Sequence, residues 1–411
     1  MDPYRLYANP RRIRDRGRPS PLTPAAFDAA EREICSWPDY RPTPLILLDD
    51  LAKSLGLEAI WYKDESRRFG LRSFKALGGA YAVLRLLQDI VARRTGNSPT
   101  SEQLRSGAYH DITAQITVTT ATDGNHGRAV AWGAQQFHCG CVIFVPRACS
   151  RNRERAIAAF GAEVIRSSGD YDATVARCAD TAKERGWIIV SDTSWEGYEQ
   201  TPAVVMQGYG VMMREVASQL SAARVPTHLF VQGGVGGLAA SVYESASQLW
   251  GESCPRLIVV EPSGAACLYE SALTGVPTPA AGEVHTIMAG LDCGRVSPLA
   301  WNILVGGADF FMTVPDSVVP DCMRLLASGA SSRESIVAGE SAVAGLAALL
   351  QAARDSRLRS QLALQPDSSV LLLGTEGDTD PELYHQLTGM SAEQVYRTGV
   401  PNGAAERFHE Q

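Results

Sequence analysis

Apolar and polar positions alternate in regular blocks along this chain of 411 residues. Short runs rich in β-branched and other apolar residues are typical of buried strands, and longer stretches with apolar residues every three or four positions are typical of helices. The expected strands are 60–65, 116–120, 141–145, 163–165, 187–190, 229–232, 257–261 and 370–373. The expected helices include 74–93, 127–137, 171–185, 204–222, 238–249 and 341–353.

Strands that alternate with helices predict βαβ crossovers, and therefore an α/β fold with open, mostly parallel sheets flanked by helices on both faces. A chain of 411 residues is long enough for two domains. Four of the expected strands fall between residues 111 and 192, which are predicted to form a smaller, mobile domain. Residues 1–110 and 193–411 would then form the large domain.

Composition and charge exclude several partners. Hydrophobic residues make up 45% of the chain and charged residues 20%, as in ordinary globular proteins. The net charge of -7 argues against a nucleic-acid partner, and no apolar run is long enough for a membrane span, so a cytoplasmic protein is expected. One basic segment near the N-terminus is predicted to be solvated or to contact another subunit; its arginines are Arg5, Arg11, Arg12, Arg14, Arg16 and Arg18.

The nine cysteines show neither the spacing of a metal site nor an even count. Cys139 and Cys141 have one residue between them, whereas a zinc knuckle needs two. Reduced, buried thiols and no metal ion are therefore expected. Whether Cys267 and Cys293 pair stays open.

The segment Arg72-Ser73-Phe74-Lys75 places one lysine in a turn after an expected strand. A lysine amine can form a Schiff base, and its pKa falls when it is desolvated or close to other cations. A lysine at a helix start is more often a plain surface residue. Here Ser73 and Phe74 before it and Gly78-Gly79-Ala80 after it favour a functional role.

Two further segments lie between an expected strand and an expected helix. Residues 120–127, Thr-Ala-Thr-Asp-Gly-Asn-His-Gly, form a polar turn whose N–H groups could bind an anion at the helix start. Residues 233–237, Gly-Gly-Val-Gly-Gly, could close on a phosphate in the same way. The second segment also fits a dinucleotide fingerprint with Glu261 as its acidic residue, which would indicate a nucleotide-binding oxidoreductase. That alternative leaves Lys75 and the polar turn unexplained.

Together the three segments resemble the tryptophan synthase β-type (fold type II) pyridoxal-phosphate enzymes. The resemblance implies pyridoxal 5'-phosphate as cofactor, a Schiff base with Lys75, and Phe74 packed beside the pyridine ring. It also implies a hydrogen bond from Asn125 to the phenolic oxygen of the cofactor. The phosphate would be held by Gly233, Gly234, Val235, Gly236 and Gly237, and the substrate carboxylate by Thr122, Gly124, Asn125 and His126.

One expected position departs from the family. Relatives usually place a serine or threonine hydroxyl against the pyridine nitrogen after the last strand, where this chain has Gly374. The next residue, Thr375, is therefore expected to face the nitrogen, with Thr379 in reserve. A hydroxyl at this place leaves the nitrogen largely unprotonated, which favours elimination over transamination.

Asp123 and Asp192 narrow the resemblance. Most relatives have serine where this chain has Asp123, and the segments 122–127 and 192–199 look like those of the diaminopropionate ammonia-lyases. That likeness implies a homodimer that eliminates ammonia from D- or L-2,3-diaminopropionate, giving pyruvate and ammonia. Asp123 and Asp192 would be the catalytic bases on the two faces of Cα. β-Replacement, or dehydration of serine or threonine, stays open as the alternative with the same cofactor and a small amino-acid substrate.

Overall fold

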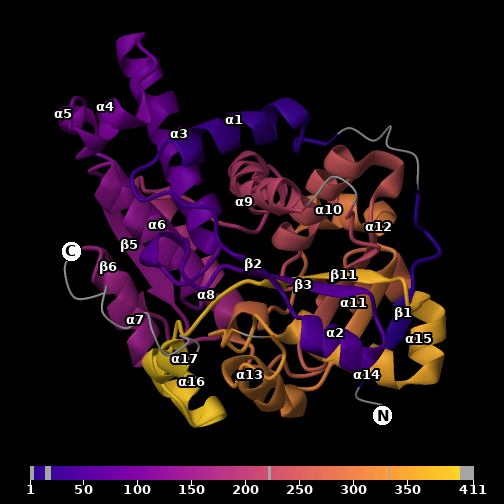
Figure 1. The fold of residues 1–411 in the computed structure, drawn as a ribbon. Coiled ribbons are helices and arrows are strands. Elements are labelled where there is room, and N and C mark those ends of the chain that lie inside the picture. Colours follow the sequence, from indigo (N-terminus) through magenta and orange to yellow (C-terminus); the bar gives the residue numbers. More distant parts are fainter. Residues whose placement is uncertain (1–3, 14–19, 221–223, 333, 399–411) are drawn as a thin grey trace.

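The computed structural model describes residues 4–13, 20–220, 224–332 and 334–398, and its strands form two separate sheets (Figure 1). The larger sheet has seven strands in the order β1-β10-β9-β8-β11-β3-β2, and the smaller has four in the order β6-β5-β4-β7. The large-sheet strands are β1 (Leu6–Ala8), β2 (Leu45–Leu47), β3 (Ala59–Asp64), β8 (His228–Gln232), β9 (Arg256–Pro262), β10 (Phe310–Val314) and β11 (Ser369–Gly374). Those of the small sheet are β4 (Thr117–Ala121), β5 (Gly140–Val145), β6 (Glu163–Arg166) and β7 (Ile188–Ile189).

The prediction of mostly parallel sheets is confirmed. All pairs in the small sheet are parallel, and so are the inner pairs of the large sheet from β10 to β3. Only the outermost strands, β1 and β2, pair antiparallel. The sequence does not predict these two strands or β10. β1 and β2 are each three residues long, which is too short for a recognisable period.

The helices that the sequence predicts are present, with shifted ends. The helix expected over 204–222 begins four residues earlier, as α9, and its expected end at Ala222 lies outside the described residues. The α-helices are α1 (Pro24–Cys35), α2 (Asp49–Leu55), α3 (Lys75–Thr95), α4 (Ser101–Arg105), α5 (His110–Thr113), α6 (Asn125–Gln136), α7 (Arg151–Ala158), α8 (Tyr171–Arg185), α9 (Gln200–Gln219), α10 (Gly237–Trp250), α11 (Cys267–Thr274), α12 (Pro298–Gly307), α13 (Val319–Ala327), α14 (Ala344–Arg354), α15 (Ser356–Leu362), α16 (Pro381–Thr388) and α17 (Ala392–Thr398). Single 3-10 turns are η1 (Arg68–Gly70), η2 (Gly251–Ser253), η3 (Ala289–Leu291) and η4 (Asp316–Val318).

The large sheet separates two hydrophobic cores. Along β11, Leu371 and Leu373 face the core formed with α3, α9 and α10, whereas Val370 and Leu372 face the core formed with α2, α13 and α14. This alternation follows from the two-residue period of a strand, because successive side chains point to opposite faces of the sheet. Burial on both faces explains why the central strands read as continuous apolar runs.

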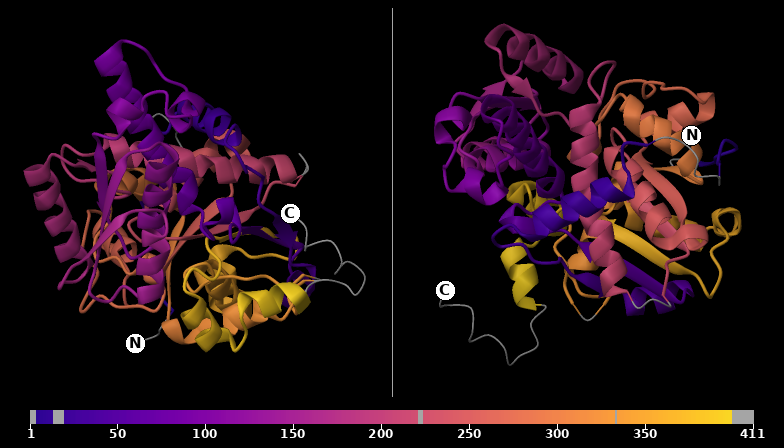
Figure 2. Two further views of the ribbon diagram at one scale, coloured as in Figure 1. Left: turned by 90° about the vertical axis from the view of Figure 1, so that its left-hand side faces the viewer. Right: turned by 90° about the horizontal axis from the view of Figure 1, so that it is seen from above.

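All four strands of the small sheet lie within residues 117–189, inside the block 111–192 that the sequence assigns to the smaller domain. With α6, α7 and α8 they form the region on the left of Figure 1, and the right-hand view of Figure 2 shows this region beside the large sheet. The precise domain boundaries remain a prediction. Within the described residues, no helix combines the length and the apolarity that crossing a membrane requires.

Two glycines at the start of α3 allow two other helices to approach it closely. A Cβ on Gly78 would lie 2.6 Å from the carbonyl oxygen of Val205 in α9 and would collide with the ring of Tyr209. A Cβ on Gly79 would lie 2.8 Å from that of Ala129 in α6. The small residues after Lys75 therefore allow α9 and α6 to pack against the first turn of α3.

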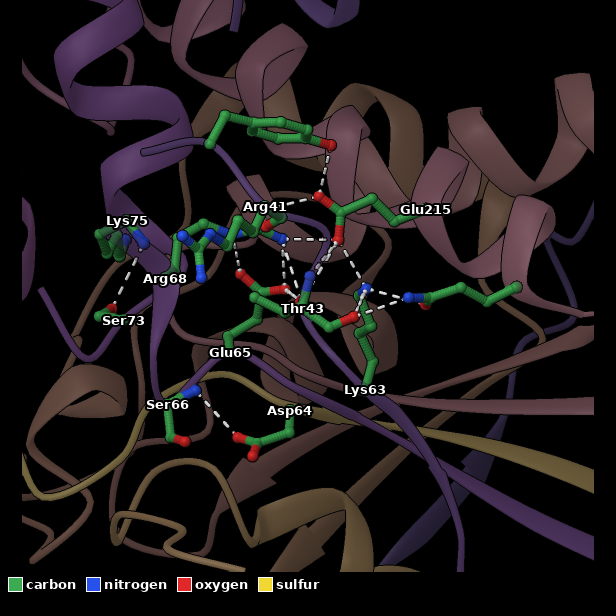
Figure 3. A network of polar contacts seen from close by, with 12 residues as sticks. Arg41, Thr43, Lys63, Asp64, Glu65, Ser66, Arg68, Ser73, Lys75 and Glu215 are labelled. Atoms are coloured by element: carbon green, nitrogen blue, oxygen red, sulfur yellow. Dashed lines mark hydrogen bonds and ion pairs between the residues drawn. The ribbon is translucent and has the colours of Figure 1, made fainter. Parts of the chain in front are cut away.

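Buried charges connect β3 with α9 (Figure 3). Arg68 is 1% exposed and forms two-pronged contacts with both Glu65 and Glu215, at 2.7–2.8 Å. Lys63 Nζ donates to Glu215 Oε2 at 2.6 Å, and Thr43 Oγ1 donates to Glu65 Oε1 at 2.6 Å. Burial alone would raise the pKa of Glu215, but Arg68 and Lys63 outweigh it and lower that pKa. Two cations thus balance two carboxylates without solvent.

Part of the basic N-terminal segment contacts its own chain. Arg5 donates to Glu270 at 3.0 Å and lies over the ring of Tyr269, and Arg12 pairs with Asp309 at 3.2 Å. The other arginines of the segment, Arg14, Arg16 and Arg18, lie outside the described residues.

Removing one charge from the buried network should destabilise the protein strongly. Glu215→Gln leaves Arg68 and Lys63 with a single carboxylate between them, and we expect the free energy of unfolding to fall by about 3–5 kcal/mol. Urea unfolding would measure this. The matched control is Glu31→Gln, because Glu31 is 39% exposed and pairs with Arg214 at the surface, so its loss should cost about 0–1 kcal/mol. Equal losses for the two variants would contradict the role given to the network.

Candidate active site

A pocket lies where the carboxyl ends of strands from both sheets meet, which is where α/β proteins place their ligands. Every residue that the sequence predicts for the site lines this pocket except Gly236, which lies within the same glycine loop. The predicted residues in its wall are Phe74, Lys75, Thr122, Asp123, Gly124, Asn125, His126, Asp192, Gly233, Gly234, Val235, Gly237 and Thr375. Segments more than 100 residues apart in sequence thus converge on one cavity.

Lys75 is the first residue of α3 rather than a turn residue. Its Nζ lies 2.5 Å from Oδ2 of Asp192 and between the rings of Phe74 and Tyr209, at 5.3 and 5.6 Å from their centres. The centres of the two rings are 4.7 Å apart, so the rings contact each other. A carboxylate and two aromatic faces therefore fix the position of the amine.

The Lys75–Asp192 contact decides the charge of both groups. Burial would lower the pKa of Lys75, but the neighbouring Asp192 outweighs it and raises that pKa. Burial would raise the pKa of Asp192, but the Lys75 ammonium, which also donates a hydrogen bond to it, lowers that pKa. In this state Lys75 is an ammonium and Asp192 a carboxylate.

His126 is a structural neighbour of this pair. Its Nε2 lies 2.8 Å from the carbonyl oxygen of Val190, so Nε2 carries the proton and Nδ1 is left as an acceptor 3.8 Å from Asp192 Oδ2. Burial lowers the pKa of His126, which favours the neutral ring. This agrees with a supporting role rather than that of a general base.

The polar turn joins β4 to α6 and is organised by Thr122. Its Oγ1 accepts from the N–H groups of Gly124 at 3.0 Å and Gly127 at 3.1 Å, and its own N–H donates to Phe144. The amides of Thr122 and Gly124 are therefore used within the protein. The Thr122 hydroxyl hydrogen and the amides of Asn125 and His126 at the start of α6 are left to hold a carboxylate.

Asp123 differs from Asp192 in its surroundings. No residue that the structure describes donates a hydrogen bond to its carboxylate or forms an ion pair with it within 4 Å. Burial, with the negative charge of Asp292 added, raises the pKa of Asp123 to about 7. Near neutral pH Asp192 therefore stays ionised, whereas Asp123 titrates.

The glycine loop runs from the end of β8 into α10. Gly234 and Gly236 have φ angles of 62° and 99°, which favour glycine. The loop places backbone N–H groups at the start of a 14-residue helix, where an anion is stabilised by unpaired donors and by the helix dipole.

The dinucleotide alternative fails at Glu261. Its two carboxylate oxygens accept from the N–H groups of Leu268 at 2.9 Å and Tyr269 at 2.7 Å, so the side chain caps the start of α11. It also lies beneath the loop, since a Cβ on Gly233 would be 2.6 Å from Glu261 Cγ. A fully buried cap is not available to a ribose hydroxyl, and the oxidoreductase hypothesis is wrong.

The structure explains the unusual Gly374. A Cβ at this position would collide with the ring of Tyr62, so no hydroxyl-bearing side chain fits there. The following residue points to the opposite side, and Thr375 accordingly lines the pocket. Thr379, the reserve candidate, donates instead to Glu376 at 3.3 Å and does not line the pocket.

Several pocket residues have no signal in the sequence. Tyr209 is mid-helix in α9, and its buried hydroxyl has no hydrogen-bond partner among the described residues. Glu376, the residue after Thr375, also lines the wall. Arg153, Tyr171, Cys293 and Ser341 also line the wall. The local sequence around these residues predicts only the helix or loop in which they lie. It does not predict contacts between segments that are far apart in the chain.

Cys267 and Cys293 do not pair with each other, because both are free thiols. Cys267 Sγ instead lies 3.5 Å from the carbonyl oxygen of Gly234. Among the described residues, no group of three or more His, Cys, Asp and Glu side chains is arranged to hold a metal ion.

Comparison with known sequences defines the class of the protein. The family described as "Pyridoxal-phosphate dependent enzyme" matches residues 37–375, which is most of the chain. The chain therefore belongs to the pyridoxal-phosphate dependent enzymes, and its cofactor is pyridoxal 5'-phosphate.

Individual relatives narrow the likeness. The diaminopropionate ammonia-lyase of Escherichia coli K12 is 41% identical over 352 residues, covering 85% of this chain and 87% of that protein. The crystal structure of an Escherichia coli diaminopropionate ammonia lyase in complex with D-serine has a TM-score of 0.86 at 37% identity, covering 94% of this chain and 96% of the other. One in complex with an aminoacrylate-PLP azomethine reaction intermediate has a TM-score of 0.84 at the same identity and coverage.

Lys75 should be the residue that carries the cofactor. Borohydride reduction of the loaded protein, followed by peptide mass spectrometry, should place the label on the peptide that contains Lys75. Lys75→Ala should lose the label and at least about a hundredfold in turnover, because the amine is both attachment point and proton carrier. Lys53→Ala is the control, since Lys53 is a 73% exposed surface side chain, and it should keep both. A label retained in Lys75→Ala would contradict the assignment.

Proposed function

We propose that this protein catalyses the α,β-elimination of ammonia from 2,3-diaminopropionate, which gives pyruvate and ammonia. The observation that carries the proposal is the pair of aspartates in one pocket, Asp192 paired with Lys75 and Asp123 unpaired. Titratable groups whose surroundings push their pKa values apart are the usual mark of assigned acid and base roles. The similarity to diaminopropionate ammonia-lyases supports this class of substrate.

The pocket fits the cofactor. Lys75 supplies the amine, Phe74 an aromatic face beside it, and the glycine loop a set of N–H groups for a phosphate at the start of α10. When bound, pyridoxal 5'-phosphate withdraws electrons from the substrate and so acidifies its Cα–H. Thr375 offers the hydroxyl that we assign to the pyridine nitrogen.

The residues of the turn would orient the substrate. The amides of Asn125 and His126, with the Thr122 hydroxyl, would hold its carboxylate at the start of α6. This contact fixes Cα relative to Lys75 and Asp123, which is the main contribution of a binding group to a unimolecular step.

The two faces of Cα would meet different bases. Asp123, with a pKa of about 7, is ionised in a large fraction of molecules at neutral pH and is basic enough to accept a proton. Asp192 has a lowered pKa and is a weak base by itself, so we assign it the task of holding the Lys75 amine that exchanges the proton on the other face. A carboxylate beside the substrate also favours an ammonium leaving group over a neutral hydroxyl.

The substrate is tested by pyruvate release. The purified holoenzyme should release pyruvate from L- or D-2,3-diaminopropionate and little from L-serine, because a hydroxyl does not pair with Asp123 as an ammonium does. A coupled lactate dehydrogenase assay would measure the rates. No pyruvate from either diamino acid, with the cofactor bound to Lys75, would instead favour β-replacement. Rapid release of pyruvate from serine, or of 2-oxobutyrate from threonine, would favour a dehydratase.

The two aspartates are tested by stereochemistry and pH. Asp123→Asn and Asp192→Asn should reduce turnover of the D- and L-substrates unequally, by about a hundredfold on the more sensitive isomer. On the isomer that depends on Asp123, the wild-type rate should fall as pH drops below about 7, since a protonated carboxyl cannot accept the proton. Equal losses on both isomers would contradict the assignment of one base to each face.

We also propose that the protein works as a homodimer in the cytoplasm. The family resemblance supports the dimer, and the free thiols agree with a reducing compartment.

A further inference from the structure

Glu376 is the second residue after the end of β11 and is 2% exposed. Its backbone forms an antiparallel bridge with Ser73, two residues before Lys75. On either side of this bridge, Phe74 N donates to the carbonyl oxygen of Thr375 at 3.1 Å, and Gly377 N donates to that of Arg72 at 3.0 Å. The segment that carries Lys75 is thus fixed to the end of β11 by main-chain hydrogen bonds.

The side chain of Glu376 reaches the other half of the site. One of its oxygens, Oε2, accepts a short hydrogen bond from Nδ2 of Asn125, at the start of α6. The second, Oε1, accepts from the N–H of Ser341 at 3.1 Å. Thr379 Oγ1 adds a longer contact to Oε2 at 3.3 Å. Its carboxylate therefore joins the turn after β4, in the small sheet, to two segments of the large one.

A positive charge offsets the buried carboxylate. Arg153 in α7 forms an ion pair with Glu340 and also interacts electrostatically with Glu376. Arg153 is itself packed against the polar turn, since a Cβ on Gly124 would lie 2.9 Å from Arg153 Cδ. Arg153 therefore places a positive charge near the buried carboxylate of Glu376.

We propose that Glu376 is a positioning residue that sets Asn125 relative to Lys75. Both oxygens of the Glu376 carboxylate accept from N–H donors, so the side chain selects the orientation of the Asn125 amide in which Nδ2 faces it. The second N–H and the Oδ1 of Asn125 are then presented to the pocket in a fixed direction. This inference rests on the binding of pyridoxal 5'-phosphate and is independent of which amino acid is the substrate.

The experiment is a double-mutant cycle on cofactor affinity. Pyridoxal 5'-phosphate is titrated into the apoprotein of the wild type, Glu376→Gln, Asn125→Ala and the double variant, and binding is followed by the absorbance of the cofactor. Glu376→Gln should raise Kd by about tenfold, because a glutamine no longer forces the amide of Asn125 into one orientation. In the Asn125→Ala background the same change should have little further effect, since its target is gone.

Two controls separate positioning from damage to the fold. Thr379→Val removes the other side-chain contact to Glu376 Oε2 and should leave Kd within about twofold of the wild type. The thermal midpoints of the apoproteins show which variants are folded. If Glu376→Gln does not fold, Glu376→Asp replaces it in the cycle, because it keeps the charge but is one methylene too short to reach Asn125.

An unchanged Kd in Glu376→Gln would overturn the proposal, and so would losses that add up in the double variant. Both results concern cofactor binding in the apoprotein. A failure of the diaminopropionate assay would therefore leave this inference untouched, and the reverse also holds.

Discussion

The position of Lys75 depends on a cluster of charged side chains that is buried from solvent. Arg68 contributes all of its guanidinium nitrogens to Glu65 and Glu215, and Lys63 and Thr43 each donate to one of the oxygens that Arg68 also contacts (Figure 3). A buried ion pair tolerates little displacement, because each lost contact leaves a charge without compensation. The end of β3 and the helix α9 can therefore meet in essentially one way, and η1, which leads to Lys75, starts from that point.

Helix packing then completes the setting of the lysine amine. Gly78 lets α9 approach the first turn of α3, and this approach brings Tyr209 against Phe74 and Lys75. Asp192 enters from the small sheet and closes the third side. The amine is thus held by elements from both sheets, so a displacement of the small sheet would change its electrostatic partner as well as the shape of the pocket.

The sequence predicts the local parts of this arrangement and misses the contacts between them. Lys75, Asn125 and the glycine loop lie in short strand–turn–helix segments, and the neighbouring residues in the sequence are enough to predict their function. Tyr209 and Glu376 act through partners more than 100 residues away, and no local pattern distinguishes them from ordinary helix or loop residues. The same reason explains the fold: central strands have a clear apolar run, whereas the three-residue edge strands β1 and β2 are defined only by pairing.

The contrast between the two aspartates follows from this geometry rather than from the residues themselves. Both lie in the same pocket, and burial alone would raise the pKa of each. The Lys75 ammonium reverses that effect at Asp192, whereas the largest influence on Asp123 after burial is the negative charge of Asp292, which raises its pKa further. A carboxylate that stays ionised can hold an ammonium, and one that titrates near neutrality can exchange a proton. The fold therefore gives two chemically identical side chains different pKa values. The position of the Lys75 amine, beside Asp192, decides which of the two stays ionised.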